Sequence, residues 1–216
     1  MPSRAIQIRR HGGPEVLEEV SVPLAAPGPR EVTVRQSAIG LNFADIYQRR
    51  GSAGPHAAAT FPLILGAHGA GTIEALGADV TGWQLGQSVA YIHPGAYQAV
   101  RNVPASRLVA LPSTISQEVA GAQLLRGLTA EYLLRRLHRV RPGEAVLVHA
   151  AAGGMGQLLA EWARSLGATV IGTVGSPEKA DVARAHGCHH VFDYRRDNFA
   201  RTCTVTASRM TPSTGR

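Results

Sequence analysis

Cysteine is nearly absent from the sequence, with only Cys188 and Cys203 among 216 residues. Two cysteines exclude a disulfide framework and a four-cysteine zinc site. The sequence also lacks any run of 18 apolar residues, which a membrane-spanning helix needs. Its first ten residues carry three arginines but no apolar segment of a signal peptide. We therefore expect a cytoplasmic protein with no membrane partner.

Lysine is the second scarce residue, because Lys179 is the only lysine among the 22 basic residues. The formal net charge is +7, but the arginines are scattered along the chain. A diffuse charge of this kind argues against nucleic-acid binding as the main function. Apolar residues make up 44% and charged residues 17%, which is typical of a chain that folds around a core.

Residues 1–122 have the pattern of a small β domain. Short segments rich in β-branched residues alternate with glycine and proline turns, and this spacing favours a barrel or sandwich. The expected strands are Ala5–Arg9, Glu31–Ala38, Gly71–Leu76, Ser88–Ile92 and Ala96–Val100. One helical turn is expected at Ala44–Arg49, ending at Gly51.

Residues 123–200 alternate helices with strands, and Ser116 can cap the helix that leads into them. The next expected helix is Thr129–Arg139, with Leu133, Leu134 and Leu137 on one face. The elements expected after it are the strands Ala145–His149, Thr169–Val174 and His190–Asp193 and the helices Met155–Leu166 and Pro177–His186. This alternation predicts a parallel sheet. The fold class is therefore α/β plus β.

A glycine loop, Ala150 to Gly156, lies between the first of these strands and its helix. Gly153 is expected to permit a tight turn, Gly154 to let the backbone approach a pyrophosphate, and Gly156 to allow close packing. Backbone N–H groups of a helix start bind phosphate well, so Ala152 and Met155 join the glycines as candidate cofactor-binding residues. A strand–helix turn without a ligand remains the alternative.

The end of the second strand indicates which dinucleotide would bind. An NAD-binding sequence has an acid about 20 residues after the glycines, where it accepts hydrogen bonds from the ribose. This sequence has Gly175 and Ser176 there, followed by Lys179, so a hydroxyl and a cation are placed to meet a 2′-phosphate. We expect NADPH rather than NADH, although Lys179 could also be a solvated helix residue.

These residues, taken together, resemble a known family. The matching stretches are HGGPEVLE (11–18), AIGLNFADIYQRRG (38–51), RGLTAEYLLR (126–135), HAAAGGMG (149–156), LGATVIGTVGSPEKA (166–180) and FDYR (192–195). They are similar to the zinc-independent NADPH:quinone oxidoreductases, of the zeta-crystallin type, in the medium-chain dehydrogenase/reductase superfamily. The resemblance implies a GroES-like catalytic domain at residues 1–122, part of a Rossmann-type NADP-binding domain at 123–200, and a homodimer.

The resemblance also implies roles for single residues. Asn42, Asp45 and Tyr47 would line the catalytic cleft near the nicotinamide. Thr129 would lie next to the carboxamide, and Tyr194 would contact the adenosine phosphate region. Asn42 and Asp45 could instead cap the turn at 44–49, and Tyr47 could be a packing residue.

No metal is expected. Zinc-dependent relatives have Cys-x-x-Asp where this sequence has Asn42 and Asp45, and Gly-His-Glu where it has Gly66, Ala67 and His68. Two ligands are missing, so a catalytic zinc site cannot form by analogy. His68 is expected to make a local hydrogen bond. The cluster of histidines and Cys188 at 186–190 lies between a helix end and a strand, which directs neighbouring side chains to opposite faces.

The expected function is hydride transfer from NADPH to a quinone, which needs no strong Lewis acid. An enoyl or carbonyl reductase, or a non-catalytic nucleotide-binding fragment, remains open. Residues 201–216 contain seven serines and threonines and almost no large apolar residues, so we expect an aberrant or disordered tail. A relative would continue after residue 200 with more strands, so we expect a truncated chain with low activity and a doubtful homodimer.

Overall fold

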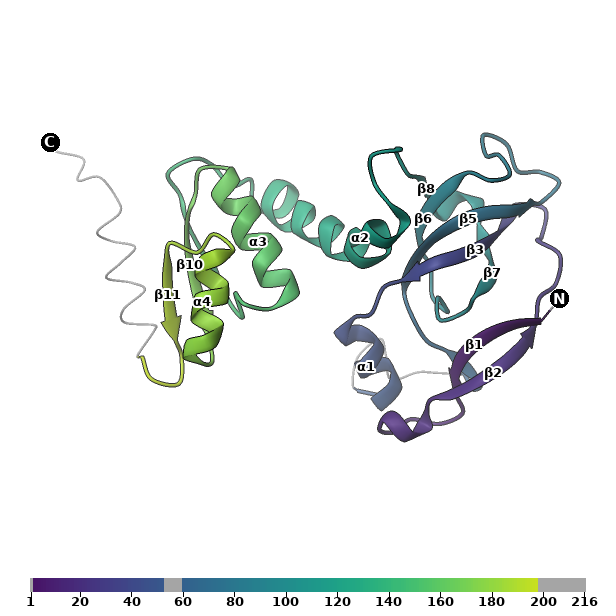
Figure 1. Cartoon of the computed structure of the whole chain (residues 1–216), viewed down its shortest axis with the longest axis horizontal. Coiled ribbons are helices and arrows are strands. Elements are labelled where there is room, and N and C mark those ends of the chain that lie inside the picture. The colour runs from purple at the N-terminus through teal and green to yellow at the C-terminus, as the bar shows by residue number, and fades with distance from the viewer. Residues whose placement is uncertain (1, 53–59, 198–216) are drawn as a thin grey trace, which may run out of the picture. The chain divides into compact units, whose positions relative to one another are not determined.

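The computed structural model describes residues 2–52 and 60–197 (Figure 1). The chain contains two compact units, which divide between Leu125 and Arg126. Unit 1 is built from antiparallel strands, and unit 2 from three parallel strands with helices. The predicted class, a β unit followed by an α/β unit, is therefore confirmed. The predicted tail at 201–216, which includes Cys203, lies outside the described residues.

Unit 1 contains two antiparallel sheets. The five-stranded sheet has the order β7 (Val100–Pro104), β3 (Glu31–Ile39), β5 (His68–Leu76), β6 (Ser88–Ile92) and β8 (Leu108–Ala110). The three-stranded sheet has the order β2 (Glu18–Pro23), β1 (Pro2–Ile8) and β4 (Leu63–Ile64). Val32 and Val34 of β3 pack with Ile73, Tyr91 and Val103 in a core that the alternation along the strands creates. Two 3₁₀ turns, Pro14–Val16 and Ala105–Arg107, connect strands.

The sequence pattern placed some strands of unit 1 wrongly. The strand predicted at Ala96–Val100 begins only at Val100, because the preceding backbone bonds to several different segments. The Tyr97 N–H donates to the Leu65 carbonyl at 2.8 Å, and the Gln36 amide donates to the Ala96 carbonyl at 2.8 Å. Strands β2, β4 and β8 were not predicted. Each is a short or charged edge strand. Strand β4 also pairs with a strand far away in the sequence, since Ile64 lies opposite Gln7.

Helix α2 (Gln117–Glu131) continues directly into a π-helical segment, Tyr132–Leu137, so no helix begins at Thr129. Ser116 caps α2 as predicted, because its hydroxyl accepts a hydrogen bond from the Val119 N–H. The His138 N–H donates to the Leu133 carbonyl, five residues earlier, which is the π-helical spacing. This wider turn leaves Leu137 65% exposed while Leu134 is buried, so the prediction of one shared face is wrong for Leu137.

Unit 2 has a parallel sheet in the order β11 (His190–Asp193), β10 (Thr169–Val174) and β9 (Ala145–Val148). Helices α3 (Gly154–Ser165) and α4 (Pro177–Ala185) pack against the sheet and against each other. Ala160 and Ala163 are fully buried, since small side chains let α3 approach the strands closely. The strands and helices predicted from Ala145 onward are confirmed to within a residue or two. Within the described ranges, no helix is long and apolar enough to cross a membrane.

Candidate functional site

The carboxyl ends of β9, β10 and β11 lie at one edge of the sheet, because the three strands are parallel. The segment after β9 bonds to β10 at this edge, where the Ala151 N–H donates to the Thr173 carbonyl at 3.0 Å. Tyr194 follows β11 and lies directly over Gly175, since a side chain on Gly175 would reach the Tyr194 ring at 2.9 Å. The structure therefore brings the glycine loop, Gly175 and Tyr194 to one edge of unit 2.

The tight turn of the glycine loop lies at Ala150. Ala150 has φ 51°, in the left-handed region, while Gly153 has the extended angles φ −78° and ψ 162°. The expectation that Gly153 makes this turn is therefore wrong. The Gly153 N–H donates to the Ala150 carbonyl at 2.8 Å and closes the turn. An alanine in the left-handed region stores backbone strain, which is concentrated at functional sites in proteins.

The other two glycines differ in their surroundings. Gly156 is buried, and a side chain there would overlap the Ala150 carbonyl and lie 2.7 Å from the Ala151 Cα. This confirms the close packing predicted for Gly156. Gly153 and Gly154 are exposed, so a ligand can reach the backbone of the loop.

The start of α3 carries no side-chain cap. Its N-cap residue is Gly153, and no acidic residue lies in its first turn. The half-buried Met155 is in that turn, and Ala152 lies two residues before the helix. The Gln157 side chain fixes the loop by donating to the Ala152 carbonyl at 2.7 Å. The sequence analysis missed Gln157, since an amide in the first turn of a helix carries no recognisable motif.

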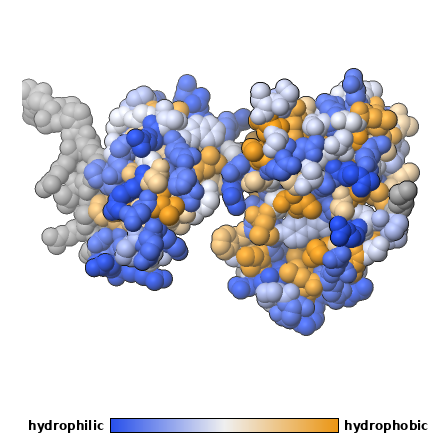
Figure 2. Space-filling model, viewed as in Figure 1, coloured by the Kyte–Doolittle hydropathy of each residue, from blue (hydrophilic) through white to orange (hydrophobic). Residues whose placement is uncertain are grey.

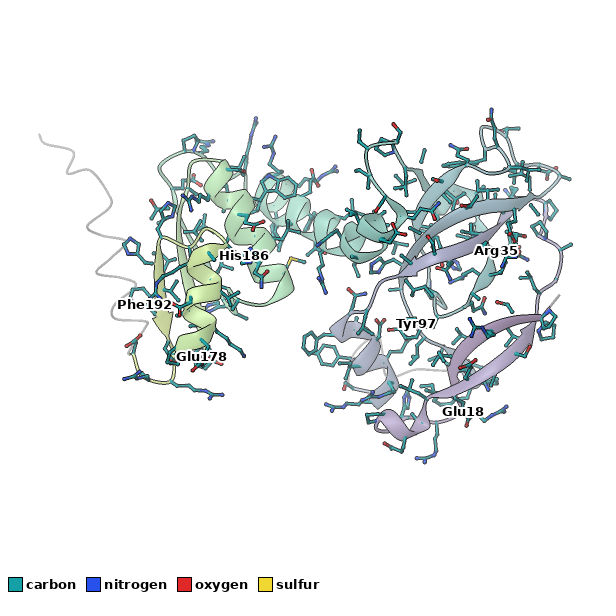
Figure 3. The ribbon with its side chains drawn as sticks, in the orientation of Figure 1. Glu18, Arg35, Tyr97, Glu178, His186 and Phe192 are labelled. Carbon is teal, nitrogen blue, oxygen red and sulfur yellow. The ribbon has the colours of Figure 1, made fainter. Side chains whose placement is uncertain are left out.

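Helix α4 has a complete cap, in contrast. The Ser176 hydroxyl accepts a hydrogen bond from the Lys179 N–H at 3.4 Å. The Glu178 carboxylate accepts hydrogen bonds from the Ser176 hydroxyl and from the Glu178 backbone N–H, and these hold the pKa of Glu178 below its usual range. Glu178 lies in the first turn of α4 (Figure 3), directly after the N-cap Ser176 and Pro177 in the chain, and the Lys179 side chain is exposed. Thr129 lies half-buried inside α2 rather than at a helix start.

In unit 1, Asn42 and Asp45 are joined at the start of α1 (Phe43–Arg50). The Asn42 N–H donates to Asp45 Oδ2 at 2.8 Å, and the Tyr97 hydroxyl donates to the same oxygen at 2.9 Å. Burial and the nearby Asp45 raise the pKa of Tyr97. Asp45 itself is buried. The capping alternative weighed for Asn42 and Asp45 therefore describes their geometry, and Tyr97 is a partner that the sequence analysis missed.

Tyr47 is not part of this network. The Tyr47 side chain is 48% exposed, and that of Phe43, one turn earlier, is 75% exposed. Both therefore lie on the outer face of α1. Apolar surface gathers over this part of unit 1 (Figure 2). A separate pocket of about 520 Å³ is lined by Ile39, Leu41 and Tyr97, among others, but by none of the three predicted catalytic residues.

Several histidines have ordinary hydrogen-bonding partners in the structure. The Asn42 amide donates to His68 Nδ1 at 3.3 Å, which confirms the local hydrogen bond predicted for the buried His68. In the segment 186–190, His186 pairs with Glu161, and the His189 ring accepts from the Val170 N–H. Cys188 is buried, which raises the pKa of its thiol. Among the described residues, no group of three or more potential ligands could hold a metal ion.

Two family patterns match the sequence. Residues 28–142 match the alcohol dehydrogenase GroES-like domain, and residues 154–209 match the family described as zinc-binding dehydrogenase. A quinone oxidoreductase of Pseudomonas aeruginosa is 48% identical over 201 residues, which are 92% of this chain and 61% of the relative. A 2-haloacrylate reductase of a Burkholderia species is 44% identical over 203 residues, which are 91% and 60%.

The structure is also similar to solved structures of quinone oxidoreductases. The quinone oxidoreductase of Pseudomonas syringae has a TM-score of 0.90 and 47% identity, over 95% of this chain and 63% of that protein. The Escherichia coli quinone oxidoreductase complexed with NADPH has a TM-score of 0.87 and 40% identity, over 94% and 62%. The chain therefore has the GroES-like and partial Rossmann architecture of these proteins. It spans about 60% of the length of the relatives that it matches.

Proposed function

Because the chain belongs to the quinone oxidoreductases of the medium-chain dehydrogenase/reductase superfamily, we propose that it is an NADPH-dependent reductase that transfers hydride to quinones. The observation that carries the proposal is the carboxyl edge of the unit 2 sheet. There an exposed glycine loop leads into an uncapped helix, and no acid follows β10 directly. The relatives with 48% and 40% identity are named for quinone reduction, and the second was solved with NADPH.

The residues at this edge fit a dinucleotide phosphate. The backbone N–H groups of Gly154 and Met155 begin α3 without a side-chain cap, which suits a pyrophosphate. Gly153 and Gly154 are both exposed, so a ligand can reach the backbone at the start of α3. Tyr194, beside Gly175, would border the adenosine, as the resemblance implies. Thr129 on α2 is proposed to contact the carboxamide.

The same edge favours NADPH over NADH. The nearest acid after β10 is Glu178, and its carboxylate is already bonded to Ser176 and to the start of α4. An acid in this position would be poorly placed to accept hydrogen bonds from the ribose hydroxyls. Lys179 is exposed and has no ion-pair partner among the described residues. We therefore assign the charge of the 2′-phosphate to Lys179. Ser176 would contact the phosphate by transferring its hydroxyl hydrogen bond from Glu178 to a phosphate oxygen.

In unit 1 we assign the polar contacts with the acceptor to Asn42 and Tyr47. One N–H of the Asn42 amide donates to His68, which leaves the second N–H for an acceptor carbonyl. The exposed Tyr47 hydroxyl is a second donor. Asp45 is buried and bonded by Tyr97 and the Asn42 N–H, so its proposed role is to hold Asn42 rather than to touch the substrate.

NADPH, when bound, would supply the hydride. A quinone that accepts the hydride becomes a hydroquinone anion, and one proton completes the hydroquinone. The Asn42 amide stabilises negative charge on the oxygen by donating a hydrogen bond. The Tyr47 hydroxyl, in contact with water, can pass the proton to the same oxygen. Neither step needs a metal ligand from this chain.

A second candidate acceptor is an activated alkene. The relative with 44% identity is named 2-haloacrylate reductase, and its name describes reduction of a halogenated unsaturated acid. The same cofactor site would serve this reaction, and the acceptor contacts would differ. A third possibility is a chain that binds nucleotide without catalysis.

The experiment follows NADPH oxidation by absorbance, with benzoquinone or 2-chloroacrylate as acceptor and a full-length relative as positive control. We expect oxidation that depends on quinone and a decrease of about tenfold in kcat/KM for Asn42→Ala. Arg50→Ala, an exposed change at the end of α1, should leave the rate unchanged. Faster oxidation with 2-chloroacrylate would support the second candidate. Binding of NADPH without oxidation by either acceptor would contradict a reductase.

A further inference from the structure

Arg126, on α2, covers the first residue of α3. A Cβ atom built on Gly154 would lie 2.9 Å from Arg126 Nη1, 3.1 Å from its Cζ and 3.5 Å from its Nη2. Three atoms of the guanidinium are therefore close to the Gly154 Cα, and the Arg126 side chain is half-buried. The glycine is what makes room for the guanidinium at the start of α3.

This position is electrostatically unfavourable without an anion. The start of a helix carries a partial positive charge from its unpaired N–H groups, so a second positive charge there is repelled. Neither an acid in the first turn of α3 nor a capping side chain compensates for it. Within the described ranges, Arg126 has no ion-pair partner. A ligand with negative charge would stabilise both the guanidinium and the helix start.

The neighbouring helix shows the arrangement that does not need a ligand. Helix α4 begins with the Ser176 cap and has Glu178 in its first turn, so its positive end is already compensated. Helix α3 has neither and has a cation instead. The contrast supports the assignment of the anion to α3, but the close contact between Arg126 and Gly154 is what identifies the residue.

We propose that Arg126 binds the pyrophosphate of the dinucleotide, opposite the backbone of the glycine loop. The inference rests on the proposed NADPH function and adds a residue to that site. A planar guanidinium can donate two parallel hydrogen bonds to phosphate oxygens, which a lysine cannot. Arg126 and Thr129 are three residues apart on α2 and so share a face of the helix. The same face would then contact both the pyrophosphate and the carboxamide.

The test measures equilibrium binding of NADPH, NADH and adenosine 2′-monophosphate to the wild-type chain and its variants. Arg126→Gln should weaken NADPH and NADH by the same factor, about 10- to 100-fold, because both contain the pyrophosphate. Adenosine 2′-monophosphate has no pyrophosphate, so its affinity should not change. The matched control is Arg135→Gln, which removes an exposed arginine from the same helical segment and should change none of the three.

The outcomes separate this inference from the proposed function. Wild-type chain that binds neither NADPH nor NADH would overturn both. Wild-type chain that binds NADPH, with Arg126→Gln binding it as tightly as Arg135→Gln does, would overturn only the role of Arg126. Arg126→Lys provides a second test should Arg126→Gln fail to fold. Lysine keeps the charge but loses the paired hydrogen bonds, so NADPH should bind several-fold more weakly, and unchanged affinity would contradict the inference.

Discussion

The two units hold their candidate functional residues in different ways. In unit 1, side chains bond to side chains, as Tyr97 does to Asp45 and Tyr91 to Gln36, and the groups involved are largely buried. In unit 2, backbone atoms hold the glycine loop in place, through the turn at Ala150 and the close packing of Gly156 against the loop. The difference suits the proposed ligands. Backbone N–H groups can bind a phosphate, with Arg126 and Lys179 adding positive charge in our proposals, whereas an acceptor carbonyl needs an oriented side chain.

The sequence contains two tryptophans, which allow each unit to be followed separately. Trp83 packs against the core of unit 1, and Trp162 packs against the core of unit 2. Replacing one tryptophan by phenylalanine leaves a fluorescent reporter in the other unit. Stability changes can therefore be assigned to one unit in the intact chain.

The largest expected effect is that of Asp45→Ala in unit 1. The change leaves the Tyr97 hydroxyl and the Asn42 N–H without their buried acceptor, which should cost about 3 kcal/mol of unfolding free energy. Denaturant unfolding, followed through Trp83, measures it. Asp79→Ala removes an exposed carboxylate and serves as the control. An equal, small effect of both changes would mean that the side-chain network does not hold unit 1.

Gly156→Ala should produce the matching loss in unit 2, of about 2 kcal/mol. The new methyl group would overlap the Ala150 carbonyl, and the backbone of the loop cannot move aside as a flexible side chain would. Unfolding followed through Trp162 reports the change. Gly153→Ala is the matched control, because its φ of −78° suits any residue and the nearest atom is 3.2 Å from the new Cβ. A larger loss for Gly153→Ala would refute the assigned geometry.

Tyr97→Phe removes one hydrogen bond from the network and should cost unit 1 about 1 kcal/mol. Its effect should disappear in the Asp45→Ala background, because the partner of the hydroxyl is already gone. A double-mutant cycle measures this coupling. Additive losses from the two changes would show that the hydroxyl and the carboxylate do not interact.

The smallest expected effect is a pH dependence confined to unit 1. Burial of the ring, helped by Arg101, lowers the pKa of His93 below its usual 6.5. The folded state then binds this proton less readily than the unfolded state. The stability of unit 1 should fall as the pH drops through 6.5 and level off below the lowered pKa. His93→Gln should flatten the curve measured through Trp83, and an unchanged slope would exclude His93 as its source.

The sequence predicted unit 2 better than unit 1. From Ala145 onward, glycines and prolines such as Gly143, Gly167, Pro177 and Gly187 lie at or near most ends of strands and helices, so local patterns suffice. In unit 1, the strand predicted at Ala96–Val100 was displaced because Gln36 and the Leu65 carbonyl bind the backbone before Val100. Contacts between residues so far apart in the sequence leave no local pattern. The π-helical segment after α2 was missed for a different reason. Its hydrogen bonds are local, as from the His138 N–H to the Leu133 carbonyl, but its leucines follow an ordinary α-helical pattern.

The candidate site was predictable only in part. The glycine loop, Gly175 and Tyr194 could be expected at one edge, because parallel strands place their carboxyl ends together. The exact turn residue, Ala150, could not, since the motif suggests that a glycine makes the turn. Tyr97 and Arg126 were missed because each acts through a neighbour from another part of the chain. The roles of Asn42, Asp45, Tyr47 and Thr129 stay predictions.

The central claim is that the carboxyl edge of unit 2 binds NADPH and selects it through its 2′-phosphate. Equilibrium titration of the chain with NADPH and NADH tests it most directly. We predict tighter binding of NADPH, and a loss of about tenfold for Lys179→Ala with NADPH alone. Arg184→Gln, which removes an exposed charge at the far end of α4, should leave both affinities unchanged. Equal binding of the two nucleotides by the wild-type chain would contradict the claim.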